Sequence, residues 1–572
     1  MGVFRIAAKS HASPDHATPS LSHARRDDVM RNLRWIRVTP IAVWTPLLLA
    51  MHACHAIEKP NIIVIYTDDH GYADLSCQQI LPDVKTPHID ALAQSGVRMT
   101  DGYCTAPQCV PSRAGLITGR YQNRFGLESN PQGKDAEVMQ QFADVDSLPE
   151  KLQQAGYATG MAGKWHLGAP QQIGTHGFDQ FFHKNSNSAG YWNMALDGGD
   201  IPPGEQRGGG YHLNLISEFA CAFIRRHSDR PFFFYLAFRA PHVPLDPPQN
   251  YLNQFPGEMP ERRRKALAML AAVDDGVGSV VETLRSLELE EQTLIFFVSD
   301  NGAPLKIHKL DAPGGGPGWD GSLNDPLNGE KGMLTEGGIR VPFVAAWKGT
   351  IPPSQVYSQP VITLDLAATA LAAAGVETAT DLDGVNLLPY LTDTDTQPPQ
   401  RSLYWRWLNQ SAIRNGPWKY IELDQRRYLF NVEKDKEELN NLFDRHTDVA
   451  DRLQKDLQNW SQQMSPPGIG ALATEGRSQT DQRFYDWYIE GIRDDRPSEP
   501  TTDATRNRSP RPKVTQQELF RRRDTDKDGN VTLEEFLNGR TGDAEKTLRR
   551  RFRQFDRNQN GRWERSEIDT RP

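Results

Sequence analysis

Cysteine is scarce in this sequence, with five residues among 572, at positions 54, 77, 104, 109 and 221. No two of them have the C-x-x-C spacing that is typical of zinc sites. Five cysteines in so long a chain are also too few for a disulfide scaffold. The fold must therefore depend on a buried core, and 38% of the residues are hydrophobic.

A large excess of one charge is also lacking. The 65 Lys and Arg residues and 73 Asp and Glu residues leave a formal net charge of -8. This is mild for the length of the chain and does not point to a nucleic-acid partner. An anionic substrate would therefore have to bind through a local cluster of Lys, Arg and His.

No apolar run near the N-terminus is long enough to span a membrane, which needs about 20 residues. The run at 41–51 follows three arginines and precedes small residues at 53–56. This arrangement is typical of an export signal, so we expect cleavage after Ala56 and a secreted or periplasmic protein. The true start is Met1 or Met30, and lipid attachment at Cys54 is a weak alternative.

Short apolar runs alternate with helical patterns after residue 57. The runs at 61–66, 231–237 and 293–298 are rich in β-branched and aromatic residues, as expected of strands buried on both faces of a parallel sheet. Helical patterns occupy 147–154 and 262–287. The alternation predicts an α/β domain with a mostly parallel sheet flanked by helices. Ligands are expected beyond the carboxyl ends of its strands.

The pattern changes after about residue 400. Short runs at 404–408, 411–414, 418–422 and 428–431 predict a small antiparallel sheet, and a helical pattern follows at 448–464. The polar segment 478–512 is expected to be a linker with some local helix. The predicted units are thus 1–56, 57–400, 401–477, 478–512 and 513–572.

The segment 109–120 reads CVPSRAGLITGR. It resembles the signature of type I sulfatases, C-x-P-S-R followed by Leu or Met, Thr and Gly, with Ile117 where Leu is usual. The resemblance covers roughly residues 57–460 and implies an alkaline-phosphatase-like fold related to arylsulfatases and N-acetylgalactosamine sulfatases. It also implies that a maturation enzyme converts Cys109 to formylglycine. The alternative is that Cys109 is an ordinary buried thiol before a helix.

A formylglycine suits the hydrolysis of sulfate esters. Its hydrated form has two hydroxyls, of which one can attack sulfur with the help of a metal and a base. Loss of a proton from the other hydroxyl can then expel sulfate. The resemblance gives Arg113, one turn into the following helix, the role of orienting the diol and offsetting its negative charge.

The remaining cysteines allow at most one disulfide. If Cys54 is removed with the export signal and Cys109 is modified, Cys77, Cys104 and Cys221 are left. Cys77–Cys104 is the expected pair. The alternative is that all three are small buried hydrophobic residues.

Two pairs of oxygen-bearing residues follow predicted strands. Asp68 and Asp69 end the first strand, and Asp300 and Asn301 follow a later one. Carboxylate and amide oxygens suit calcium or magnesium rather than zinc. The resemblance assigns all four residues, with the modified Cys109, to a calcium site. Either pair alone could be a turn or a helix cap.

Three further segments resemble sulfatase signatures. In GKWHLG at 163–168, the resemblance places Lys164 on the sulfate and formylglycine oxygens and His166 on the diol as a candidate base. In APHVP at 240–244, it places His242 to protonate the departing sugar oxygen, a step worth roughly 10²–10⁴ in rate. In GEKG at 329–332, it places Lys331 on a sulfate oxygen, whereas Arg340 nearby is expected to be structural. These basic groups and the cation would neutralise the sulfate locally.

The C-terminal unit contains two segments that resemble EF-hand calcium loops, DTDKDGNVTLEE at 524–535 and DRNQNGRWERSE at 556–567. Each has acidic or amide side chains at positions 1, 3 and 5, glycine at 6 and glutamate at 12. The predicted ligands are Asp524, Asp526, Asp528, Asn530, Glu535, Asp556, Asn558, Asn560, Arg562 and Glu567. We expect an all-α EF-hand pair stabilised by calcium. A dockerin-like module, or acidic turns without metal, would be the alternative.

The expected substrate is a sulfated carbohydrate or a small sulfate ester. Export and a Gly-rich segment at 312–321, expected to border the pocket, fit a sulfated polysaccharide or glycosaminoglycan fragment. Two other functions stay open. One is a formylglycine-dependent phosphonate or phosphodiester hydrolase, and the other is a non-catalytic calcium-binding scaffold. A scaffold would be expected to have lost Cys109, Lys164 or His242.

Overall fold

The structure is a computed structural model. It describes residues 59–130, 142–206, 209–305, 320–377, 381–392, 397–468 and 475–491, and in the C-terminal unit 520–521, 523–537, 552, 555–556, 558, 560–564 and 566. The predicted export signal, residues 312–319 of the Gly-rich segment, most of the predicted linker and Glu567 lie outside these ranges.

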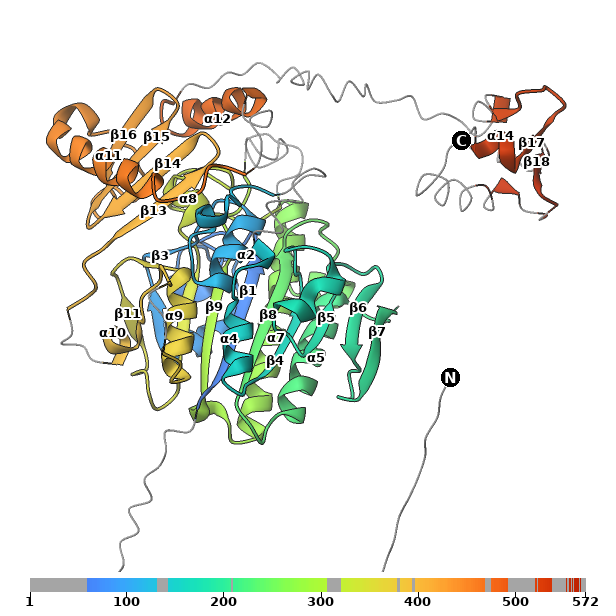
Figure 1. Ribbon diagram of the computed structural model, residues 1–572, viewed down its shortest axis with the longest axis horizontal. Coiled ribbons are helices and arrows are strands. Elements are labelled where there is room, and N and C mark those ends of the chain that lie inside the picture. Colours follow the sequence, from blue (N-terminus) through green and yellow to red (C-terminus); the bar gives the residue numbers. More distant parts are fainter. Residues whose placement is uncertain are drawn as a thin grey trace, which may run out of the picture. The chain divides into compact units, whose positions relative to one another are not determined.

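A ten-stranded sheet forms the centre of the α/β domain, in the order β11-β2-β10-β9-β1-β8-β4-β5-β6-β7 (Figure 1). Its middle is parallel, as predicted, and consists of β9 (Thr293–Ser299), β1 (Asn61–Asp68), β8 (Phe232–Pro241), β4 (Ala158–Gly163) and β5 (Gln180–His183). The outer strands are β11 (Gln355–Tyr357), β2 (Val97–Met99), β10 (Phe343–Ala346), β6 (Gly190–Met194) and β7 (Asp200–Gln206). Antiparallel pairs join β10 to β2 and β9, and β6 to β5 and β7.

Helices cover both faces of the sheet because its strands bury both faces. Along β1, Ile62 and Val64 belong to one hydrophobic cluster and Ile63 and Ile65 to the other. The first cluster includes side chains of α2 (Cys109–Thr118), α4 (Leu148–Gln154) and α9 (Leu364–Ala373). The second includes α1 (Pro87–Gln94), α5 (His212–Arg226) and α7 (Glu261–Ser286).

Shorter elements connect these layers. The 3-10 turns are η1 (Ser76–Gln78), η2 (Gln122–Phe125), η3 (Pro170–His176), η4 (Glu290–Gln292) and η5 (Phe443–Arg445). The short helices are α6 (Gln249–Leu252), α8 (Glu336–Ile339) and α10 (Leu388–Thr392), and β3 (Gly102–Tyr103) pairs with β12 (Val361–Ile362). The predicted helix at 147–154 is present as α4, with Ser147 as its cap in a capping box with Glu150.

The predicted antiparallel sheet after residue 400 is present. It consists of β13 (Ser402–Trp407), β14 (Gln410–Asn415), β15 (Trp418–Leu423) and β16 (Arg426–Asn431), followed by α11 (Thr447–Ser461). The segment from 478 was expected to be a linker with some local helix, and α12 (Glu475–Tyr488) is the helix at its start. The Tyr485 ring of α12 stacks on Tyr428 with centroids 5.5 Å apart, so the helix belongs to this subdomain.

The described C-terminal unit is not all-α as predicted. It contains β17 (Asn530–Thr532), α14 (Leu533–Leu537) and β18 (Arg562–Glu564), and the two strands pair antiparallel with Val531 opposite Trp563. Phe520, Phe536, Phe552 and Trp563 form a small hydrophobic cluster with Val531.

The expected Cys77–Cys104 disulfide is absent. Cys77, Cys104, Cys109 and Cys221 are all free thiols, and the last three are buried. The alternative stated for them, small buried hydrophobic residues, therefore describes Cys104 and Cys221. Within the described residues, no helix combines the length and apolar character that crossing a bilayer demands.

Candidate active site

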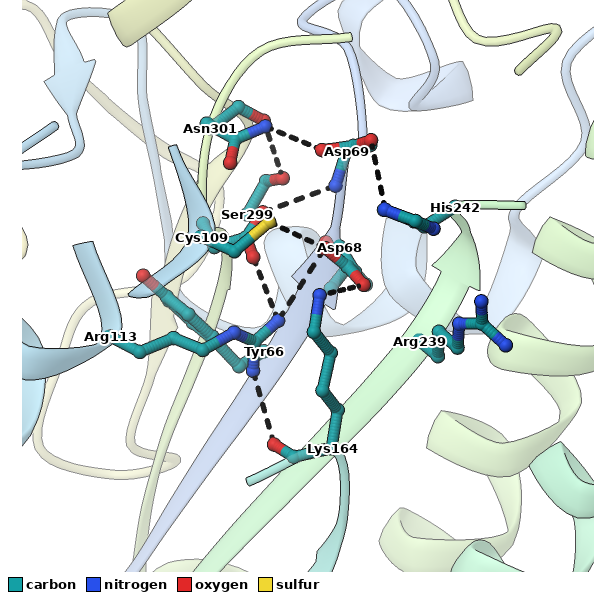
Figure 2. Close-up of polar contacts among 12 residues, drawn as sticks. Tyr66, Asp68, Asp69, Cys109, Arg113, Lys164, Arg239, His242, Ser299 and Asn301 are labelled. Carbon is teal, nitrogen blue, oxygen red and sulfur yellow. Dashed lines mark hydrogen bonds and ion pairs between the residues drawn. The ribbon is translucent and has the colours of Figure 1, made fainter. Parts of the chain in front are cut away.

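Two pairs of oxygen-bearing side chains meet at the carboxyl edge of the parallel strands. β1 and β9 run in register with Thr67 opposite Ser299, so the residues after each strand emerge side by side. Asp69 has a left-handed backbone, with φ of 60°. Its N–H donates to Asp300 Oδ1 at 3.1 Å, and the Asn301 amide donates to Asp69 Oδ1 at 2.7 Å. The side chains of Asp68, Asp69, Asp300 and Asn301 are all fully buried. Figure 2 shows the contact between Asn301 and Asp69.

Cys109 is the first residue of α2 and points into this group of oxygens. Its Sγ lies 3.5 Å from Asp68 Oδ1 and 3.4 Å from Lys331 Nζ. Burial raises the pKa of the Cys109 thiol to about 12, against the opposing charges of Lys164 and Lys331. The unmodified thiol is therefore protonated at neutral pH and is not an activated nucleophile.

Arg113 lies one turn further along α2 and contacts residues in or directly after four strands, β1, β4, β8 and β9. Its Nη2 donates to Asp300 Oδ2 at 2.8 Å, and its Nη1 donates to the Tyr235 hydroxyl and the Lys164 carbonyl. The guanidinium also lies over the Tyr66 ring, 5.1 Å from its centroid. Arg113 is completely buried, so its geometry is fixed by these partners.

Two lysines approach the aspartates from different elements. Lys164, just after β4, places its Nζ 2.5 Å from Asp68 Oδ2. Lys331, from the loop before α8, places its Nζ 2.6 Å from Asp69 Oδ1. The three carboxylates thus face three buried cationic side chains, counting Arg113.

His242, which is the residue after β8, completes this side of the site. Its Nε2 lies 3.7 Å from Asp69 Oδ2, and its Nδ1 contacts the Val243 carbonyl at 2.7 Å. If Nδ1 carries a proton, it donates this bond and leaves Nε2 facing the aspartates. Burial lowers the pKa of His242 to about 4, although Asp68 and Asp69 oppose the shift.

His166 lies two residues beyond Lys164 with a left-handed backbone, φ 61°. Its side chain is exposed to solvent and makes no hydrogen bond or ion pair with any residue that the structure describes. The surrounding protein, together with the charges of Lys164 and Arg113, lowers the pKa of its imidazole.

The oxygens at the strand ends fit a hard cation. Ligand atoms of Asp68, Asp69, Cys109 and Asp300 lie within 4.8 Å of one another. Asp69 Oδ2 and Asn301 Oδ1 are buried and have no hydrogen-bond partner, which is costly unless something positive faces them. Three carboxylates and an amide oxygen are donors that calcium and magnesium prefer.

A model of the sulfatase family matches residues 60–376, which is more than half of the chain. The chain belongs to the sulfatase family. A second model, the C-terminal region of N-sulphoglucosamine sulphohydrolase, matches residues 329–463 of this sulfatase. The protein is therefore a sulfuric ester hydrolase, as the signature at 109–120 predicted.

Individual relatives of this sulfatase agree with the family match. N-acetylgalactosamine-6-sulfatase of Canis lupus familiaris is 32% identical over 417 residues, covering 67% of this chain and 76% of that enzyme. N-acetylgalactosamine-6-O-sulfatase of Bacteroides thetaiotaomicron is 28% identical over 496 residues, covering 70% and 93%. The crystal structure of Ps i-CgsB in complex with k-i-k-neocarrahexaose is similar with a TM-score of 0.64 at 31% identity, covering 74% and 98%.

Three residues of the site were not singled out from the sequence. Tyr66 and Tyr235 lie inside strands and contact Arg113, and neither has a sequence signal that separates it from other core aromatics. Asp320 lies within 4.8 Å of Asp69 and His242, and its Oδ2 accepts the Val243 N–H at 3.4 Å. The Gly-rich segment 312–321 was predicted to border the pocket, and an acidic residue near the end of this segment is the sequence feature that could have identified Asp320.

The predicted EF-hand ligands come together only in part. Asp524, Asp526 and Asp528 place carboxylate oxygens within 4.8 Å of one another. Asp524 is 8% exposed, and its Oδ1 is buried without a partner. Glu535 is not part of this group, because its two oxygens accept bonds from Thr525 and Thr532.

In the second loop, side-chain oxygens accept backbone N–H groups of the loop itself. Asp556 accepts from Asn560 and Gly561, Asn558 accepts from Asn560, and Asn560 accepts from Arg562. Glu567, the predicted twelfth-position ligand, is outside the described residues.

Proposed function

We propose that this sulfatase hydrolyses sulfate esters of sulfated carbohydrates with a formylglycine made from Cys109 and with a bound calcium ion. One observation carries the proposal. The Cys109 side chain lies among the buried oxygens of Asp68 and Asp300, with Lys331 beside it and Arg113 one turn away. Such a site can hold a cation and an anionic ester together despite the protein's net negative charge.

The residues divide the work as follows. The formylglycine would supply a hydroxyl nucleophile, and calcium, held by Asp68, Asp69, Asp300 and Asn301, would offset negative charge. Lys164 and Lys331 would hold the sulfate oxygens. Arg113 would orient residue 109 and hold Asp300 in place. His242 would give the proton of Nε2 to the departing sugar oxygen, which requires that the bound sulfate ester hold its imidazole in the doubly protonated form, and His166 is the candidate base that releases sulfate.

The carbohydrate substrate is inferred from the relatives. The two named relatives carry N-acetylgalactosamine sulfatase names, and the similar crystal structure holds k-i-k-neocarrahexaose. The export signal predicted at 1–56 would deliver the enzyme to the periplasm or the outside, where such polymers occur. A formylglycine-generating maturation enzyme is the required partner inside the cell.

The test is a screen of the mature enzyme, co-expressed with a maturation enzyme, on defined sulfated oligosaccharides, with phosphonate and phosphate diesters alongside. We expect sulfate release from at least one oligosaccharide, and mass spectrometry should show formylglycine at residue 109. Cys109→Ala should lose at least 10³-fold in kcat/KM while keeping its melting temperature within a few degrees. Equal activity of this variant would overturn the mechanism, and preference for a diester would overturn the reaction class.

We also propose that the C-terminal unit binds calcium. The support is the group formed by Asp524, Asp526 and Asp528, together with the buried Asp524 oxygen that lacks a partner. Glu535 would turn from its threonine partners toward the ion, and the second loop would bind more weakly because it has fewer carboxylates. Calcium here would stabilise the unit.

A further inference from the structure

The loop that carries Lys331 bends sharply on both sides of this residue. Gly329 and Gly332 have left-handed backbones, with φ of 89° and 91°. The Lys331 N–H donates to the Ala303 carbonyl at 3.2 Å, close to the strand end that bears Asp300. Within the loop, the Met333 N–H donates to the Glu330 carbonyl at 3.0 Å, and contacts from other elements fix the position of this turn.

Contacts from α12 and from β14 add to the bonds that Ala303, Pro107 and Asn324 make with the loop backbone. Glu330, immediately before Lys331, is fully buried, and its Oε1 accepts the Tyr488 hydroxyl at 2.9 Å. Its Oε2 accepts the Leu305 N–H at 2.5 Å. The Asn328 amide donates to the Tyr488 carbonyl at 2.8 Å, so both the side chain and the backbone of Tyr488 hold this loop.

The other side of Lys331 is held through Gln410 of β14. The Gln410 amide donates to the Gly332 carbonyl at 3.0 Å, and its Oε1 accepts the Leu334 N–H at 3.1 Å. The Tyr485 hydroxyl of α12 donates to the same Oε1 at 2.8 Å. Tyr485 and Gln410 are completely buried, and burial raises the pKa of Tyr485 well above its usual value, so its hydroxyl remains a donor.

The two family matches end by residue 463, before α12 begins. We propose that Tyr485 and Tyr488 of α12 are positioning residues that hold the Lys331 ammonium against Asp69 and residue 109. This inference rests on the proposed contact of Lys331 with the sulfate ester. Neither tyrosine touches the reacting atoms, so each acts through the loop at 328–334.

The experiment uses the full-length enzyme, with the fraction of formylglycine at residue 109 measured by mass spectrometry. The variants are Tyr485→Phe, Tyr488→Phe and the pair, each alone and combined with Lys331→Ala. Tyr428→Phe is the matched control, because its hydroxyl bonds to Glu490 at 3.0 Å and not to the loop. Kinetic constants are measured with 4-nitrocatechol sulfate and corrected for the converted fraction.

We expect each single variant to lose about threefold to tenfold in kcat/KM, as for one neutral hydrogen bond, and the pair to lose more. The control should stay within twofold of wild type. In the Lys331→Ala background, the tyrosine pair should cost less than a further twofold, because the group they position is gone. A merely structural role would give the same loss in both backgrounds.

Two results would overturn the inference. One is a tyrosine pair variant with activity within twofold of wild type, and the other is a full loss that persists in the Lys331→Ala background. Failure of the proposed function looks different, because Lys331→Ala itself would then keep wild-type activity. Thermal melting of every variant distinguishes a loss of folding from a displaced Lys331. Tyr488→Phe is the variant least prone to unfold, because Tyr488 is partly exposed.

Discussion

At the scale of single residues, the site places three carboxylates, Asp68, Asp69 and Asp300, next to one another in a fully buried position. Burial, followed by the nearby Asp68, raises the pKa of Asp300 to about 7, whereas burial is outweighed at Asp69, whose pKa falls to about 2 because Lys331 and His242 lie beside it. The two pKa values differ because Asp69 lies beside Lys331 and His242, whereas the charge of Asp68 adds to the effect of burial at Asp300. A bound divalent ion would favour the ionised form of both.

His242 is the residue whose role depends most on the substrate. A sugar alkoxide leaves poorly without a proton, whereas a nitrocatechol anion leaves readily. His242→Gln should therefore cost roughly 10²–10⁴ in kcat/KM on a sugar sulfate and much less on 4-nitrocatechol sulfate. The measurement is the ratio of the two losses on one enzyme preparation, with His227→Gln as a remote histidine control. Equal losses on both substrates would exclude His242 as the acid.

Most of the proposed catalytic residues could be predicted from the sequence because they lie in short motifs next to strand ends. Asp68 could be predicted because it ends an apolar run, and Lys331 could be predicted because glycines flank it in the segment 329–332. Tyr235 and Tyr485 could not be predicted, because each acquires its role only from a partner more than 70 residues away. Arg340 was correctly expected to be structural, since it pairs with Asp101 and Glu336.

At the scale of elements, a buried ion cluster joins the antiparallel subdomain to α8. Lys419 of β15 lies 2.8 Å from Glu336 of α8 and 3.0 Å from Glu438. Arg340 also pairs with Glu336, at 3.1 Å, so Glu336 has the greater share of positive charge. Its pKa is accordingly lowered to about 2, although burial acts in the opposite direction.

Glu438 makes the stability of this junction dependent on pH. Burial, against the attraction of Lys419, raises the pKa of Glu438 to about 7, so the folded state favours its protonated form. The resulting stabilisation is complete below the unfolded pKa near 4.5 and is lost as the pH rises through 7. Glu438→Gln cannot ionise. Its melting temperature, relative to wild type, should therefore rise between pH 5 and pH 8.

Thermal unfolding of both proteins across that range is the measurement. Glu437→Gln is the control, because Glu437 is the neighbouring residue, carries the same charge and is exposed. A difference between Glu438→Gln and wild type that does not change with pH would show that Glu438 stays ionised in the folded protein.

The strands and the long helices were predictable because their hydrophobic patterns are strong and continuous. Tertiary contacts that composition does not reveal account for the differences. Local helix was expected after 478, but its packing on the antiparallel subdomain was not. The α12 sequence is polar with a few aromatics, and it is helical because Tyr485 stacks on the subdomain and bonds to Gln410. The expected Cys77–Cys104 disulfide failed for a similar reason, since Cys104 faces the Ile339 carbonyl and Cys77 lies beside Asp90.

At the scale of the whole molecule, the C-terminal unit allows a test of calcium binding that is independent of catalysis. Asp526→Asn should reduce the calcium-dependent rise in the melting of the full-length protein, since an ion that binds only the folded state stabilises it. Sulfatase activity should not change. Differential scanning calorimetry with calcium and with a chelator is the measurement. Asp448→Asn, an exposed residue of α11, is the control of equal charge change. Identical calcium shifts in the two variants would contradict binding at the loop.

Activity of the whole enzyme should also depend on the host. In cells without a formylglycine-generating enzyme, we expect a folded protein that has lost at least 10³-fold in activity, because the Cys109 thiol is protonated and buried. Circular dichroism and melting should match those of the matured protein, and mass spectrometry should show cysteine at residue 109. Full activity of such a preparation would mean that the modification is not needed.

The burial of α2 has a consequence for the timing of biosynthesis. Cys109 and its neighbours in the signature are all inaccessible once α2 is in place, so a maturation enzyme of the proposed kind would not reach them in the folded protein. The proposed conversion would have to precede folding of this helix, so the unfolded chain would be modified only during a short interval. The speed at which the sheet closes over α2, compared with the rate of conversion, would set the fraction of molecules that are ever active.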